Sequence, residues 1–336
     1  MNVGRTPDSE IPDVGNGLWE RIRDAVQAES GAETSLWNGQ LDYTNNANRG
    51  ETWEDGRMCL NRADVVEPLQ EMYATAGQPA TPEQWIKRRN ALKTVIHEYS
   101  HVTAPDGHTH ADREAQLRRG LARPIEEGVT EAWSQDVVDR VAVRVLPAEM
   151  AEQIKAVRDV RGPHAYPAWE PAARSLAGRV GADVGLDGTE VLRRMSAETL
   201  EGKARVVADL LYDASDLPNV VPPSEEQTVR EEISDWIQGK FAELDALYWD
   251  PRANRDAISK QRGLEIAAGA SDVVRDAEKF YRTWHHPTQE LDKLRGVLEG
   301  QAPAAGAPRV PQGEAAQGRR TAQPVEQIAT RGTPAR

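Results

Sequence analysis

Two histidines four residues apart frame a short stretch of the chain that could bind and activate a metal ion. The stretch is His97-Glu98-Tyr99-Ser100-His101, which has the pattern H-E-x-x-H. On a helix, residues four apart lie on one face, so both imidazoles could reach the same ion. Glu98, next to the first histidine, could then accept a proton from a metal-bound water. The chain has only seven histidines, so chance alone would produce roughly 0.01 such matches.

The surrounding residues predict the helix that this geometry needs. Residues 81–84 (Thr-Pro-Glu-Gln) read as a capping box with a proline at the first helical position. The apolar residues that follow recur every three or four positions: Trp85, Leu92, Val95, Ile96, Tyr99 and Val102. Pro105 and Gly107 would stop the helix. We therefore predict one helix over residues 82 to about 103; the alternative is a surface pair of histidines on an ordinary amphipathic helix.

A catalytic zinc ion needs a third protein ligand and an open position for water. Glu127 is the strongest candidate, because it opens a second predicted helix and the connecting segment is long enough to return past the metal. Glu131 lies one turn later on the same face and could accept the Nδ1–H of a ligand histidine. Glu126 points about 100° away around the helix and is less well placed.

His108 is the rival third ligand. It comes one residue later than the pattern H-E-x-x-H-x-x-G-x-x-H requires, and Gly107 directly precedes it. This departure favours Glu127 over His108. His110 is a weaker candidate still, and both histidines could instead be solvent-exposed loop residues.

Hydrolysis through a tetrahedral intermediate also needs a hydrogen-bond donor besides the metal. His164 and Tyr166 are the catalytic candidates for this role, on a predicted loop, and Tyr212 is another. The spacing selects none of them. Each could equally be an ordinary surface histidine or a packed tyrosine.

Together the two motifs resemble the gluzincin branch of the zincin-like zinc metallopeptidases. The resemblance is carried by the H-E-x-x-H motif at residues 97–101 followed by Glu127-Gly128-x-x-Glu131, and it covers residues 92–134. It implies a zincin-like catalytic domain, Zn2+ as the cofactor, and Glu98 as the general base of peptide-bond hydrolysis. We therefore expect a zinc metallopeptidase, a hydrolase whose partner is a peptide or protein substrate.

Two other functional classes stay open. The chain could be a binding or structural protein with the zincin fold but without turnover, although such a site has no need of an intact Glu98. It could also be a zinc hydrolase acting on a non-peptide substrate, because H-E-x-x-H does not by itself determine the substrate.

The composition disfavours several further classes. Lys and Arg number 41 against 54 Asp and Glu, a net charge of −13, which argues against binding to nucleic acid or to a membrane surface. The single cysteine, Cys59, rules out an internal disulfide and a cysteine-based zinc site. No Sec-type signal peptide and no transmembrane segment is recognisable. We expect a cytoplasmic protein, or one exported without a Sec signal; the sequence predicts no oligomeric state.

The pattern of predicted elements indicates an α+β, mostly α fold with a small sheet. Strand-like runs at residues 41–44 and 57–61 place the sheet before the motif helix, and residues 103–123 read as a polar connection. Pro124 opens a second long helix that ends before Pro147. Further helices are expected near residues 148–159, 167–181, 188–214, 225–247 and 271–285.

These patterns divide the chain into regions. We expect a zincin-like metallopeptidase domain over residues 16–220 and a helical C-terminal part over residues 221–300, joined near Pro222-Pro223. Residues 1–15 are rich in Gly, Pro and charge. Residues 301–336 are rich in Ala, Pro and Gly and lack aromatic residues. Both end segments should therefore be disordered.

Overall fold

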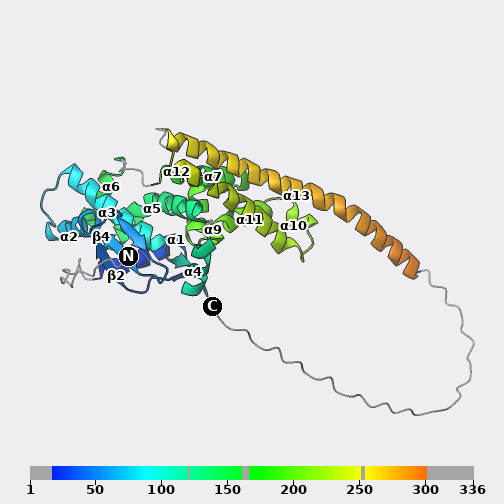
Figure 1. Cartoon of the computed structure of the whole chain (residues 1–336), viewed down its shortest axis with the longest axis horizontal. Coiled ribbons are helices and arrows are strands. Elements are labelled where there is room, and N and C mark those ends of the chain that lie inside the picture. Colours follow the sequence, from blue (N-terminus) through cyan, green and yellow to red (C-terminus); the bar gives the residue numbers. More distant parts are fainter. Residues whose placement is uncertain (1–16, 120–121, 161–165, 251–253, 301–336) are drawn as a thin grey trace, which may run out of the picture. The chain divides into compact units, whose positions relative to one another are not determined.

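The computed structural model describes residues 17–119, 122–160, 166–250 and 254–300. These residues form a mostly helical protein with a small sheet (Figure 1), which confirms the expected α+β, mostly α class. Residues up to Pro287 belong to one compact unit, and residues from Thr288 onward belong to another. The segments 1–15 and 301–336, predicted to be disordered, lie outside the described residues.

Both predicted strand-like runs belong to a three-stranded sheet, and its third strand, β3 (Gly50–Thr52), was not predicted. The strands of this sheet are β2 (Leu41–Thr44), β3 and β4 (Met58–Asn61), in the order β2-β4-β3. β2 runs parallel to β4, whereas β3 runs antiparallel to it. Met58 and Leu60 are fully buried, because alternate residues of a strand point to the same face. In this order β3 forms one edge of the sheet.

Helix α3 (Pro82–Ser100) carries the H-E-x-x-H motif and begins as predicted. Thr81 Oγ1 accepts a hydrogen bond from Gln84 N at 3.3 Å, and Gln84 Oε1 accepts one from Thr81 N at 2.8 Å. These two bonds satisfy two of the backbone donors that a helix start leaves free. The capping box in the sequence therefore sets the first residue of the helix.

The end of α3 comes slightly earlier than predicted. The helix stops at Ser100 rather than near residue 103, because β5 (Thr103–Ala104) pairs antiparallel with β1 (Thr34–Ser35). His101 still has helical backbone angles, with φ −68° and ψ −19°. The two histidines of the motif therefore share one face of the helix as expected.

Part of the segment predicted to be a polar connection is helical. Helix α4 (His110–Arg119) lies within residues 103–123. Thr109 N donates a hydrogen bond to Asp112 Oδ2 at 2.9 Å, and Asp112 N donates one to Thr109 Oγ1 at 3.3 Å. This reciprocal pair caps a helix whose residues have too little apolar content to show a period in the sequence.

Helix α5 (Arg123–Val145) is the second predicted helix and carries the glutamates of the candidate site. It packs against α1 (Leu18–Ser30), α3 and α7 (Glu170–Val184). Its Trp133 side chain is fully buried. Because neighbours surround α5, its position relative to α3 is determined by the core of the protein.

The other described helices belong to the first unit, except for the last part of the longest one, which continues past Pro287 into the second. They are η1 (Arg62–Val66), a π-helical turn, and α2 (Glu67–Ala74), α6 (Ala148–Ala156), α8 (Gly188–Ser196), α9 (Gly202–Asp213), α10 (Leu217–Val220), α11 (Glu226–Ala242), α12 (Asp245–Tyr248) and α13 (Arg255–Gly300). None of the described helices combines the length and the apolar composition that crossing a bilayer requires.

Three predicted helices have different bounds in the structure. The helix expected over 188–214 is split into α8 and α9, because Thr199 Oγ1 accepts a hydrogen bond from Gly202 N at 3.2 Å and a new helix starts there. The helix expected over 225–247 is split into α11 and α12. The helix expected over 271–285 is part of α13, which starts earlier, at Arg255. The early part of α13 packs closely on α7 at Gly263, where a Cβ would collide with the Ala172 backbone.

The joint expected at Pro222-Pro223 lies inside the first compact unit. α11 packs against α9, and the apolar face of α11 is buried: Val229, Ile233, Ile237 and Phe241. Residues on both sides of position 220 therefore share one hydrophobic core. The expected boundary between residues 220 and 221 does not separate compact units.

Candidate metal centre

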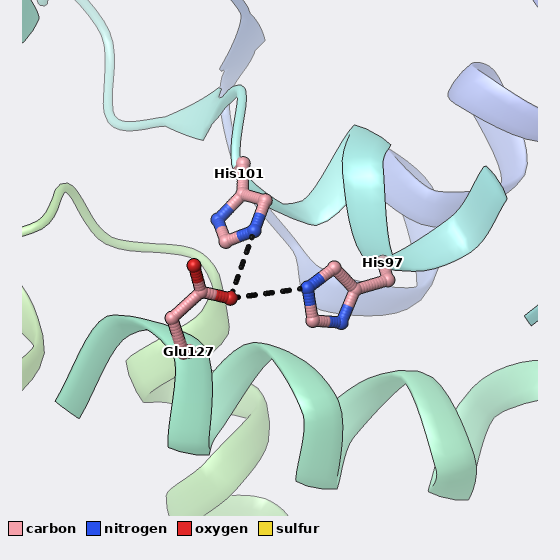
Figure 2. Close-up of side chains that lie close together, drawn as sticks. All are labelled: His97, His101 and Glu127. Atoms are coloured by element: carbon pink, nitrogen blue, oxygen red, sulfur yellow. Dashed lines mark hydrogen bonds and ion pairs between the residues drawn. The ribbon is translucent and has the colours of Figure 1, made fainter. Parts of the chain in front are cut away.

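Three side chains predicted to bind a metal converge between α3 and α5. Figure 2 shows His97 and His101, from the end of α3, pointing toward Glu127 from the first turns of α5. Glu127 Oε2 lies 3.3 Å from His97 Nε2 and 3.5 Å from His101 Nε2. One potential ligand atom from each residue lies within 4.8 Å of the others. Two imidazoles and one carboxylate form a donor set found in catalytic zinc sites, so the group fits a zinc ion.

A separate carboxylate stands behind each histidine. Glu131 Oε2 lies 3.2 Å from His97 Nδ1, and Glu126 Oε1 lies 2.7 Å from His101 Nδ1. Each imidazole therefore directs Nε2 toward Glu127 and Nδ1 toward an outer carboxylate. Such an arrangement fixes the tautomer and the orientation of a ligand histidine. The structure places Glu131 where the helical spacing predicted it.

Glu126 is better placed than the sequence suggested. We expected it to point away, because it lies about 100° from Glu127 around α5. The rings of His97 and His101 stand at 84° to one another, so their Nδ1 atoms face different directions. The carboxylate that contacts His101 is therefore that of Glu126, the residue next to Glu127, rather than that of a residue one turn later in α5.

A lysine contacts each outer carboxylate. Lys93 Nζ forms an ion pair with Glu131 Oε1, and Lys203 Nζ lies 3.2 Å from Glu126 Oε2. Lys93 precedes His97 by one turn of α3, a spacing that could have indicated its role. Lys203 comes from α9, far along the chain, and no local pattern points to it.

The proposed base Glu98 is held by the edge strand of the sheet. Its side chain is buried, and Thr52 Oγ1 donates a hydrogen bond to its Oε2 at 2.8 Å. A Cβ at Gly50 would collide with the Glu98 carboxylate, so a larger residue there would displace that carboxylate. Burial raises the pKa of Glu98, although the charges of His97 and His101 oppose the shift.

Tyr166 is the predicted oxyanion donor that the structure brings to the site. Its ring stacks on His97, with centroids 5.6 Å apart and planes at 8°. Burial together with the charges of Glu127 and Glu98 raises the pKa of the Tyr166 phenol. Tyr166 therefore stays protonated and can act as a donor beside the metal position.

The remaining catalytic and metal-ligand candidates are His164, Tyr212, His108 and His110. His164 lies outside the described residues. Tyr212 faces the Arg230 guanidinium at 3.9 Å, and none of its described contacts reaches the metal group. His108 Nδ1 lies 4.0 Å from Asp112, and His110 is exposed; neither belongs to the described metal-binding group.

Arg113 is a further residue near the site that sequence reasoning missed. It is a buried residue of α4, and its guanidinium donates a hydrogen bond to the backbone carbonyl of His101. Its positive charge also acts on Glu126 and Glu98. An arginine in a polar, charged segment carries no sequence signal for such a role.

The buried charges of the site stabilise one another. Burial alone would lower the pKa of His101, but Glu127 and Glu126 raise it to about 10. Against the same effect of burial, Glu127 and Glu131 raise the pKa of His97. Burial would raise the pKa of Glu127, but His101 and His97 hold it well below its usual value. A zinc ion would therefore have to displace imidazolium protons in order to bind.

The metal centre is the feature of this chain that points to a function. No family model, curated protein or solved structure shows significant similarity to the chain. Function must therefore be inferred from the chemistry of His97, His101 and Glu127 and of the groups around them.

Proposed function

We propose that this protein is a zinc-dependent metallopeptidase with a zincin-like domain, in which His97, His101 and Glu127 hold Zn2+. The observation that carries the proposal is the convergence of an H-E-x-x-H pair and a downstream glutamate, with a carboxylate behind each histidine. An ordinary surface pair of histidines would need neither burial nor such partners. The contacts at Nδ1 leave Nε2 of both rings for the metal.

Each residue around the metal position has a separate role in the proposed hydrolysis. Zinc, when bound, supplies Lewis-acid activation of water and of the substrate carbonyl. Glu98 accepts a proton from the attacking water and passes it to the leaving amine, and its hydrogen bond from Thr52 holds the carboxylate in place. The hydroxyl of Tyr166 donates a hydrogen bond to the developing oxyanion.

The proposed substrate is a peptide or protein. Among the described strands, β3 pairs with β4 alone, and it lies beside Glu98 through Thr52. An extended peptide can add to such an edge through backbone hydrogen bonds. The net charge of −13 favours neutral or basic peptides over polyanions.

Zinc content and peptide hydrolysis, measured on the same samples, test the proposal. The wild-type chain should hold one zinc ion and cleave a generic protein substrate. Glu127→Ala should lose tight zinc binding, because it removes a ligand. Glu98→Gln should keep the zinc and lose at least about 100-fold in turnover, because it removes the base at constant volume. His108→Ala is the control and should change neither property.

Other outcomes separate the alternatives. Loss of zinc in His108→Ala but not in Glu127→Ala would make His108 the third ligand and the gluzincin assignment wrong. Stoichiometric zinc without cleavage of any peptide would favour a non-peptide zinc hydrolase or a binding protein. Full peptide cleavage by Glu98→Gln would remove Glu98 from the mechanism.

A further inference from the structure

Lys203 is buried at the metal centre although it belongs to a distant helix. Its side chain is 1% exposed, which is rare for a lysine unless the ammonium is fully paired. Nζ lies 3.2 Å from Glu126 Oε2 and donates to the carbonyl oxygens of Met195 at 3.3 Å and Glu198 at 3.1 Å. Two of the three N–H donors of the ammonium group therefore bind backbone carbonyls, and its charge is paired with Glu126.

The contacts of Lys203 lead directly to a proposed zinc ligand. Lys203 engages Oε2 of Glu126, and Oε1 of the same carboxylate lies 2.7 Å from His101 Nδ1. Both carboxylate oxygens are therefore engaged, one by α9 and one by the ligand. A glutamate held at both oxygens has a defined orientation, and so has the imidazole that it contacts.

The carboxylate that contacts His97, the other histidine, depends less on a single lysine. Glu131 Oε1 contacts Lys93 and also accepts a hydrogen bond from Gln135 Nε2 at 2.9 Å. Lys93 is also more exposed than Lys203, at 16%. Without Lys93, Glu131 Oε1 would still accept the hydrogen bond from Gln135. Glu126 Oε2, in contrast, has Lys203 as its described ion-pair partner.

We propose that Lys203 is a positioning residue of the metal centre, which holds Glu126 so that His101 presents Nε2 to the zinc ion. The inference rests on the proposed zinc site. It extends the candidate metal centre beyond α3 and α5 to α9, and to the end of α8 and the turn after it, whose carbonyl groups at Met195 and Glu198 accept hydrogen bonds from the ammonium.

Zinc affinity of the full chain, measured by competition with a chromophoric chelator, tests this role. Lys203→Met should weaken zinc binding by about 10- to 100-fold, the usual loss when a partner of a ligand histidine is removed. Lys155→Met is the matched control. It removes an ion pair with Glu152 on the surface of α6 and should leave the affinity unchanged. The absorption spectrum of bound Co2+ should change in Lys203→Met and not in the control.

A double-mutant comparison separates positioning from simple destabilisation. Lys203→Met leaves the buried Glu126 charge without its lysine counter-ion and with His101 as its described ion-pair partner, which could unfold the chain. The pair Glu126→Gln and Glu126→Gln/Lys203→Met avoids that charge in both backgrounds. If Lys203 acts through Glu126, adding Lys203→Met to Glu126→Gln should change zinc affinity less than about twofold.

Two results would overturn the inference. One is a folded Lys203→Met variant that binds zinc with wild-type affinity. The other is a further loss of 10-fold or more when Lys203→Met is added to Glu126→Gln, since Lys203 would then act independently of Glu126. A wild-type chain that binds no zinc would reject the proposed function itself, which is a different outcome from either of these.

Discussion

In each histidine of the candidate metal centre, the two ring nitrogens face different carboxylates. Nε2 of both rings faces Glu127, whereas Nδ1 of His97 faces Glu131 and Nδ1 of His101 faces Glu126. A carboxylate at Nδ1 fixes the tautomer and increases the basicity of the ligand nitrogen. The same carboxylates favour the imidazolium form, so protons and zinc compete for one pair of side chains.

The pKa of His101 predicts how the zinc-free protein responds to pH. In the folded chain this pKa is raised from 6.5 to about 10. The stabilising effect of the imidazolium is therefore complete below about pH 6.5 and is lost as the pH rises to about 10. We expect the thermal midpoint of the zinc-free protein to fall across this range in circular dichroism melts.

A variant without the His101 imidazole and the zinc affinity of the wild-type protein provide two further tests of this pH dependence. His101→Gln lacks this titration and should show a flatter profile over the same pH range. Zinc affinity should change in the opposite direction and rise with pH, because zinc binds the neutral imidazole. A wild-type midpoint that is constant between pH 6.5 and 10 would contradict the assigned ion pairs.

At the scale of elements, close approach decides which side chains reach the site. β3 approaches α3 closely enough for Thr52 to hydrogen-bond to Glu98. Similarly, α7 approaches α5 at Gly128, where a Cβ would lie 2.8 Å from the Trp169 carbonyl oxygen. That approach lets Tyr166, just before α7, stack on His97. Both contacts bring a residue from another element to the H-E-x-x-H helix.

The contact between β3 and α3 predicts a role for Thr52 in turnover. Thr52→Val keeps the shape of the side chain but removes the hydrogen bond to the Glu98 carboxylate. A bond to a charged group contributes about 1.5–3 kcal/mol, so we expect a fall in kcat of roughly tenfold or more with zinc content unchanged. Thr52→Ser keeps a hydroxyl and should retain most activity. Equal losses in both variants would assign the effect to packing instead.

The close contact between α5 and α7 predicts the effect of a methyl group at Gly128. Gly128→Ala should push the Trp169 backbone away, destabilise the protein by about 1–3 kcal/mol as overpacking does, and lower turnover by moving Tyr166. Gly178→Ala on α7 is the control, because a Cβ there meets nothing within 4 Å. Urea unfolding and hydrolysis rates check both variants; similar stability changes in the two would argue against a tight contact at Gly128.

For the whole molecule, the candidate metal centre depends on helices from both sides of the expected domain boundary after residue 220, although its own residues, Lys203 included, all precede that boundary. His97 and Glu127 belong to the first half of the chain, and Lys203 belongs to α9. α9 is in turn covered by α11, which follows Pro222-Pro223. The helices beyond position 220 are thus part of the support of the site.

Two truncations test this dependence. A chain ending at residue 220 loses the buried face of α11: Val229, Ile233, Ile237 and Phe241. Each such side chain contributes about 1.5–3 kcal/mol on burial, and typical domains have only about 5–15 kcal/mol of net stability. We expect this fragment to be unfolded or aggregated by circular dichroism and sedimentation, without tight zinc binding.

A chain ending at residue 300 is the matched control. It lacks residues 301–336, whose composition offers too little apolar surface for packing. Its thermal midpoint and zinc content should equal those of the full chain. A stable, zinc-binding fragment 1–220 would instead show that the first 220 residues fold as an independent domain.

The features that depend on helical periodicity could be predicted from the order of the residues. The capping box at Thr81 and Gln84 started α3 at the predicted residue. Spacings of four residues placed His97 and His101 on one face of α3, and Glu127 and Glu131 on one face of α5. Such relations follow from the 3.6-residue turn alone and need no knowledge of the neighbouring elements.

Packing between distant elements determines which other groups complete the site, and no local pattern predicted them. The crossing of α3 and α5 turned the two imidazoles at 84° to one another and so brought Glu126 to His101. The packing of α9 and β3 added Lys203 and Thr52. These contacts join residues far apart in the chain through close packing of whole elements, and close packing depends on the shapes of all the side chains at an interface. No local period in the sequence encodes that fit, whereas the helices and their motifs were readable from local spacing.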